Sequence, residues 1–123
     1  VKFVGEIRGR LKYRFLSGAE LVIVPSIWEM LSLTVLETMA QGKIVIASDS
    51  YGNPYIIDDK KNGFIYRHGD LASLKKLVLD ILADKRKFEY IGKNARTKIR
   101  KSYRWEKVTE LVEKAYYDSL FLR

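Results

Sequence analysis

The chain has 123 residues, 47% of them hydrophobic and 31% charged, which is the balance of an ordinary globular protein with a single core. The absence of cysteine excludes a disulfide framework and a thiolate metal site. No apolar run approaches the roughly 18 residues that a membrane span requires. The net charge of +8 is unevenly distributed, because residues 75–107 carry twelve basic and four acidic groups while the rest of the chain is nearly balanced.

Short apolar segments alternate with helical ones along the first two thirds of the chain. The apolar segments are rich in Val, Ile, Phe and Tyr, which is typical of strands that are covered on both faces of a parallel sheet. We predict these strands at residues 1–7, 20–26, 43–49 and 63–67. Between them, residues 11–19 and 32–42 are predicted to be helical.

From Asp70 onward the apolar periodicity is helical only, and it predicts three helices within residues 70–84, 85–103 and 105–122. Strands and helices in alternation, followed by helices alone, predict an α/β fold. We expect a Rossmann-like parallel sheet of about four strands, with helices on both faces and a helical C-terminal third. No flexible linker divides residues 1–123, so a single domain is expected.

The segment VPSIWEMLSLTVLETMAQG, residues 24–42, carries the candidate site. Its strand would deliver Ser26, Glu29 and Ser32 to the carboxyl edge of the sheet, where open α/β folds bind ligands. A helix that begins near Ser32 would point free N–H groups at the same place, which suits a phosphate. The carboxylates of Glu29 and Glu37 suit vicinal hydroxyls of a sugar or ribose. The alternative is that Glu29 is a plain loop residue and Glu37 a solvated helix residue.

The stretch PSIWEMLSLTVLETMAQGKIVIAS resembles the signature of the nucleotide-sugar-binding domain of group 1 glycosyltransferases, retaining and family-4-like enzymes with two Rossmann-like domains (the GT-B class). The positions that match this signature in register are Pro25, Ser26, Glu29, Leu33, Leu36, Glu37, Met39, Ala40, Gly42, Val45, Ile46, Ala47 and Ser48. Segments on both sides also resemble the family, so the likeness covers essentially the whole chain.

The resemblance implies a role for each matching residue. Glu29 and Glu37 would be the two glutamates of an E-x7-E pair, of which Glu29 is the catalytic residue that orients the donor sugar and Glu37 binds the ribose. The donor sugar and diphosphate would lie against Ser26, Met30, Leu31, Ser32 and Leu33. Gly5 and Arg8 would lie near the nucleoside. The family transfers sugars with retention of anomeric configuration, and the resemblance implies no cofactor and no metal at the pyrophosphate.

Several positions depart from the family pattern. Residues 30–32 are Met-Leu-Ser, where the family usually has Pro-Phe-Gly, so we expect Ser32 to cap the helix with its hydroxyl. Ile44 replaces a proline. Tyr51 and Tyr55 stand where glycine and glutamate are usual, which leaves the identity of the donor open.

The resemblance also implies parts that this sequence does not contain. The family has an acceptor-binding first domain, and its nucleotide-binding domain begins with two further strands, which in the sheet would lie between the strands formed by residues 1–7 and 20–26. Because these parts do not appear in the sequence, we expect the chain to be a C-terminal portion of a longer enzyme, inactive alone and weak in binding a nucleoside diphosphate. We predict that residues 1–7 pair directly with residues 20–26, and a homodimer through the exposed sheet edge is the next alternative.

The basic stretch at residues 85–105 interleaves lysine and arginine with aromatic residues. Three interpretations stay open. The first is a solvated helix face whose aromatics enter the core, and the second is contact with an anionic membrane, which would suit a lipid-linked acceptor. The third is a nucleic-acid surface, although we do not expect nucleic acid to be a partner. A non-catalytic interaction module with the same fold is a further alternative. The expected location is cytoplasmic, with peripheral membrane contact left open.

Overall fold

The computed structural model describes residues 1–121 and contains one parallel sheet in the order β1-β2-β3. The strands are β1 (Leu21–Val24), β2 (Ile44–Ser48) and β3 (Phe64–Tyr66). All five residues of the central β2 are buried, because the strand has a neighbour on each side and helices on each face. The predicted α/β fold with a parallel sheet is confirmed, with three strands rather than about four.

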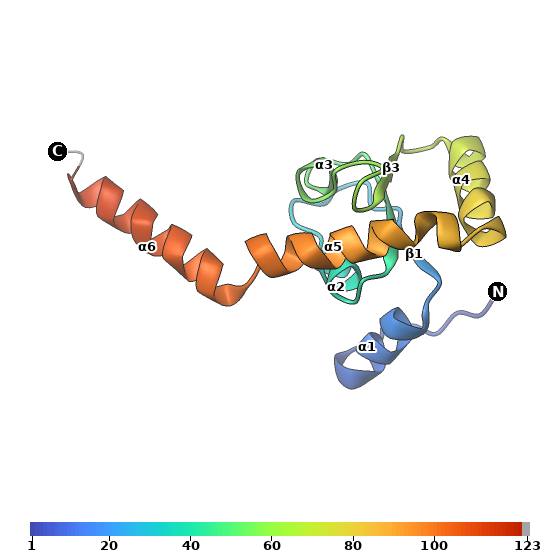
Figure 1. The fold of residues 1–123 in the computed structure, drawn as a ribbon, viewed down its shortest axis with the longest axis horizontal. Coiled ribbons are helices and arrows are strands. Elements are labelled where there is room, and N and C mark those ends of the chain that lie inside the picture. The colour runs from blue at the N-terminus through green and yellow to red at the C-terminus, as the bar shows by residue number, and fades with distance from the viewer. Residues whose placement is uncertain (122–123) are drawn as a thin grey trace.

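The strand predicted at residues 1–7 is wrong. These residues form no strand and are almost all exposed, and Figure 1 shows the N-terminal trace running apart from the sheet into α1 (Gly9–Gly18). The predicted pairing of residues 1–7 with β1 is wrong as well, since β2 is the only neighbour of β1 within residues 1–121. Apolar spacing indicates that a segment is suited to burial, but a strand forms only where another strand accepts its hydrogen bonds.

Helices cover both faces of the sheet, as predicted. Those that follow β1 and β2 are α2 (Leu33–Ala40) and the single turn α3 (Asn53–Ile56). After β3 come α4 (Leu71–Ala83), a 3₁₀ turn at Arg86–Phe88, α5 (Glu89–Ser102) and α6 (Trp105–Phe121).

The core has two halves, because successive side chains of a strand point to opposite faces. On one face, Val45 and Ala47 of β2 pack with Val35 and Met39 of α2 and with Ala95 of α5. On the other face, residues of β2 and β3 pack with α4 and α5, and Phe88 meets Phe64 edge to face, with ring centroids 5.9 Å apart. The second cluster consists of Ile44, Ile46, Phe64, Tyr66, Ile81 and Ile91.

Helix α5 lies close to the end of α2. Gly92 is buried where α5 passes Gly42, and a Cβ at Gly92 would lie 2.1 Å from the Gly42 carbonyl oxygen. Gly42 itself has a φ of 70°, which places it in the left-handed region that ends helices. A glycine at position 92 therefore allows the backbone of α5 to lie against Gly42 at the end of α2.

The last helix, α6, extends away from the sheet (Figure 1). Val108 is its one residue that is not exposed among those the structure describes, and apolar side chains such as Leu111 and Leu120 face solvent. None of the helices within residues 1–121 is both long and apolar enough to cross a membrane.

The basic stretch spans the 3₁₀ turn and α5. Ile91 and Ala95 give α5 a buried face, while most of its lysines and arginines are exposed. Its aromatics divide, since Phe88 packs against the core while Trp105 is 84% exposed. The solvated-face interpretation accounts for the exposed basic side of α5 and for the packing of Phe88. The membrane and nucleic-acid alternatives stay predictions.

Candidate functional site

The loop after β1 and the loop after β2 are tied together at the carboxyl edge of the sheet. The Ser48 hydroxyl donates a hydrogen bond to the Ser26 carbonyl, and the Gly52 N–H donates to the Glu29 carbonyl at 2.8 Å. Because both loops leave the same edge of parallel strands, these bonds fix the backbone of Glu29 beside the residues that follow β2.

The second tie depends on the absence of a side chain at Gly52. A Cβ there would lie 2.0 Å from the Met30 carbonyl oxygen and 2.7 Å from that of Glu29. This role of Gly52 was not predicted from the sequence. A glycine after a strand is the only sequence signal that could have suggested a close backbone approach.

Helix α2 begins where the sequence predicts. Ser32 is its N-cap with 1% exposure, and its hydroxyl accepts a hydrogen bond from the Val35 N–H at 3.4 Å. The predicted cap is confirmed. The first intrahelical donor is the Leu36 N–H, which bonds the Ser32 carbonyl at 3.1 Å. The N–H groups of Leu33 and Thr34 come before it and have no intrahelical acceptor, so the helix start presents backbone donors near the loop that carries Glu29.

Glu37 lies on α2 five residues after the cap, and its two carboxylate oxygens have different environments. Oε1 accepts a hydrogen bond from the Lys12 ammonium of α1 at 2.6 Å. Oε2 is buried and has no hydrogen-bond partner within the part of the chain that the structure describes. Glu37 is therefore not a solvated helix residue, since its side chain is 21% exposed and paired across the fold.

A groove of about 410 Å³ runs between α2, α5 and the start of α6. Apolar side chains line it, and Glu37 is the one acidic residue in the lining. The full lining is Leu31, Leu33, Leu36, Glu37, Ala40, Ile99, Tyr103, Trp105 and Val108. The structure thus brings three of the predicted site residues, Leu31, Leu33 and Glu37, to one groove, while Glu29 lies outside this lining.

The loop around Glu29 is apolar and open. Met30 is 79% exposed, and Trp28 stacks on Tyr51 with ring centroids 4.5 Å apart and planes inclined by 15°. Glu29 itself is half-buried. Tyr51 departs from the family pattern, but its stack on Trp28 is not predictable from the sequence, because residues 28 and 51 meet only after β1 and β2 are aligned.

Gly5 and Arg8 precede α1 and lie on the exposed N-terminal segment. Gly5 has a φ of 65°, and the Arg8 guanidinium pairs with Glu6 at 2.8 Å. Within residues 1–121, no hydrogen bond or ion pair joins either residue to α2, so their predicted role beside a nucleoside stays a prediction.

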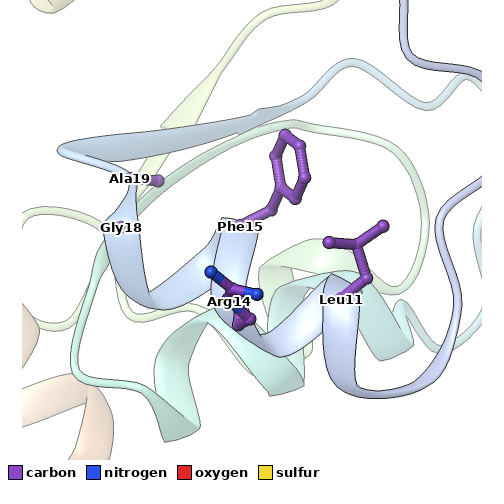
Figure 2. A pocket seen from close by; sticks show the side chains of 5 residues that line it. All are labelled: Leu11, Arg14, Phe15, Gly18 and Ala19. Atoms are coloured by element: carbon purple, nitrogen blue, oxygen red, sulfur yellow. The ribbon is translucent and has the colours of Figure 1, made fainter.

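A second hollow, of about 550 Å³, lies on α1 and is lined by Leu11, Arg14, Phe15, Gly18 and Ala19. Figure 2 shows Leu11 and Phe15 on the same side of the helix, as their spacing of four residues requires. The lining contains no carboxylate and none of the predicted site residues, so this hollow is separate from the groove that holds Glu37.

The fold defines the class of protein, which is a parallel α/β domain. Its candidate site lies at the carboxyl edge of the sheet, where Glu29 precedes the start of α2 and Glu37 lies on that helix. Comparison with known proteins identifies the family. The family model for group 1 glycosyl transferases matches residues 1–98. The chain belongs to the group 1 glycosyltransferases.

Individual relatives agree with this family. The chain is 33% identical over 121 residues to a sulfoquinovosyl transferase of Arabidopsis thaliana, covering 95% of this chain and 23% of that protein. Sucrose-phosphate synthase from Thermosynechococcus elongatus superimposes with a TM-score of 0.87 at 28% identity, covering 97% of this chain and 30% of the other. The Anabaena protein HepE, solved in complex with UDP-glucose, gives a TM-score of 0.72 at 25% identity over 88% of this chain and 29% of its own. The chain thus spans less than a third of each of these relatives.

Proposed function

We propose that this chain is the nucleotide-sugar-binding part, from the C-terminal domain, of a retaining, family-4-like glycosyltransferase that transfers a sugar to a glycan or lipid-linked acceptor. The observation that carries the proposal is the carboxylate of Glu37. A buried acceptor oxygen without a partner is costly unless something donates to it, and a ribose hydroxyl in the groove would do so. HepE, a structural relative, has been solved with UDP-glucose, which supports a donor of this class.

In this proposal the residues have separate tasks. Glu29 holds the hydroxyls of the donor sugar, and Ser26, Met30, Leu31, Ser32 and Leu33 surround the sugar and diphosphate. The backbone donors at the start of α2 meet phosphate charge. Gly5 and Arg8 lie toward the nucleobase. No metal is required at the pyrophosphate, because the helix start and basic residues elsewhere in the whole protein take that role.

Binding and turnover of the full-length protein test the proposal. Calorimetry with UDP, GDP and ADP identifies the nucleotide, and Glu37→Gln should weaken its binding about tenfold, the usual effect of losing a charge-assisted hydrogen bond. Glu29→Ala should reduce turnover far more than it weakens nucleotide binding, because Glu29 contacts the sugar. Equal losses in both quantities would contradict the role of Glu29, and unchanged binding in Glu37→Gln would contradict the ribose site.

A further inference from the structure

Lys12 forms an ion pair that joins two separate helices. Its ammonium donates to Glu37 Oε1 at 2.6 Å across a sequence separation of 25 residues. Every other ion pair within residues 1–121 involves a more exposed carboxylate, such as that of Glu89, which pairs with Lys93 along α5. The hydrogen bond with Glu37 raises the pKa of Lys12 above its usual value, which favours the charged form of the ammonium.

The two oxygens of Glu37 are thereby distinguished. Oε1 is occupied by Lys12, whereas Oε2 is buried and has no hydrogen-bond partner within residues 1–121. A carboxylate with both oxygens free could rotate about its last torsion, which is broad. Fixing one oxygen by a charged donor from α1 fixes the position of the other.

We propose that Lys12 is a positioning residue, which holds the Glu37 carboxylate so that Oε2 faces an incoming ribose hydroxyl. This inference rests on the proposed function. It also gives α1 a task in donor binding, since Leu16 is its one buried residue among those described and the Lys12–Glu37 pair connects it to α2.

A comparison of nucleotides with and without ribose hydroxyls tests the positioning role in the full-length protein. The probes are the nucleoside diphosphate that binds best among UDP, GDP and ADP, and its 2′,3′-dideoxy counterpart. We expect the wild-type protein to prefer the hydroxylated ligand by about tenfold, as one well-placed charge-assisted hydrogen bond allows. Lys12→Met should reduce that preference to about twofold or less, while Lys12→Arg should retain most of it.

The kinetic effect should fall on donor binding. Lys12→Met should raise KM for the nucleotide-sugar with kcat within about twofold of wild type, because a residue that positions the ribose contact acts on binding rather than on bond cleavage. Lys93→Met is the matched control, since it removes a lysine from an exposed pair on α5, and it should change neither quantity. If Lys12→Met does not fold, as judged by circular dichroism, Lys12→Gln replaces it.

The outcomes separate the two proposals. Adding Lys12→Met to Glu37→Gln should cause no further loss, because both act through one contact. If Glu37→Gln abolishes the preference for the hydroxylated ligand and Lys12→Met leaves it intact, the positioning role is wrong and the proposed function stands. If no nucleoside diphosphate binds the wild-type protein, or Glu37→Gln leaves the preference intact, the ribose site fails and the role of Lys12 fails with it.

Discussion

The sheet layer and the terminal helix both carry many apolar side chains but bury them very differently. In the sheet layer, β2 is buried at all five positions, and α2 and α5 each contribute residues with no exposed surface. In α6, side chains such as Leu111, Tyr117 and Leu120 are each more than half exposed. Helices α5 and α6 both carry apolar side chains among charged ones, so the difference between these two helices lies in what packs against each of them.

This difference shows what an amphipathic pattern can establish. An apolar stripe indicates that a helix can pack against another surface, but it does not indicate which surface. For α5 that surface is β2 and α2, reached through the close approach of Gly92 to Gly42. For α6, nothing within residues 1–121 covers the stripe beyond Val108. Residues 1–7 are a similar case, because their apolar side chains are suited to burial but almost all of these residues are exposed.

The largest expected effect comes from removing a core side chain. Ile91 of α5 is completely buried, so Ile91→Ala should lower the free energy of unfolding by about 3 kcal/mol, through lost burial and the cavity it leaves. The matched change Leu111→Ala in α6 should stay within about 0.5 kcal/mol. Chemical denaturation of the whole protein measures both. A loss above about 1 kcal/mol for Leu111→Ala would show instead that another surface covers the apolar side of α6.

A smaller effect is expected where two backbones meet. Gly92→Ala would place a methyl group 2.1 Å from the Gly42 carbonyl oxygen, which forces α5 away from α2 and should cost about 2 kcal/mol. Gly18→Ala in α1 has open space around it, and it should be neutral or stabilise by about 0.5 kcal/mol through the unfolded chain. Thermal unfolding compares the two variants. Similar stabilities of the two variants would mean that α5 can move away from Gly42 at little cost in free energy.

Much of the fold could be predicted from local sequence. The three strands lie within predicted apolar runs, and the central β2 is buried on both faces. Ser32 caps α2 because its hydroxyl accepts a hydrogen bond from a free N–H of the first turn, that of Val35. The strand at residues 1–7 could not be judged in this way. Its apolar content is real, but strand formation depends on a hydrogen-bonding neighbour elsewhere in the chain, and local spacing holds no information about that neighbour.

The residues of the candidate site also divide into those that a local motif predicts and those that only the folded structure reveals. Glu29, Ser32 and Glu37 were identified because they lie in one continuous motif. Lys12, Gly52 and the stack of Trp28 on Tyr51 were missed, because each of these contacts joins residues more than 20 positions apart. Contacts of that kind follow from the alignment of β1 with β2 and from the packing of α1 on α2, so they become visible only in three dimensions.

The smallest effect expected is a pH-dependent one, and it compares an ion pair between elements with one inside a helix. Asp58 accepts a hydrogen bond from Lys98 of α5 at 2.8 Å and so ties the loop before β3 to that helix. In α6, Lys107 pairs with Glu110 along the same helix. The hydrogen bond from Lys98 is the main cause that lowers the pKa of Asp58 in the folded protein, and Asn62 adds to it.

Because the folded pKa of Asp58 lies below that of the unfolded chain, about 3.9, the pair contributes its full stability above that value and loses it as the pH falls through the folded pKa. Asp58 is half exposed, so the contribution should be about 1 kcal/mol or less. Asp58→Asn should therefore lower the Tm slightly at pH 6 to 7 and have a smaller effect near pH 3. Lys98→Met should show the same trend, and adding it to Asp58→Asn should remove little more. A Tm difference that stays constant from pH 7 to pH 3 would mean that the pair does not hold α5 against the loop, and that α5 is retained by its buried face alone.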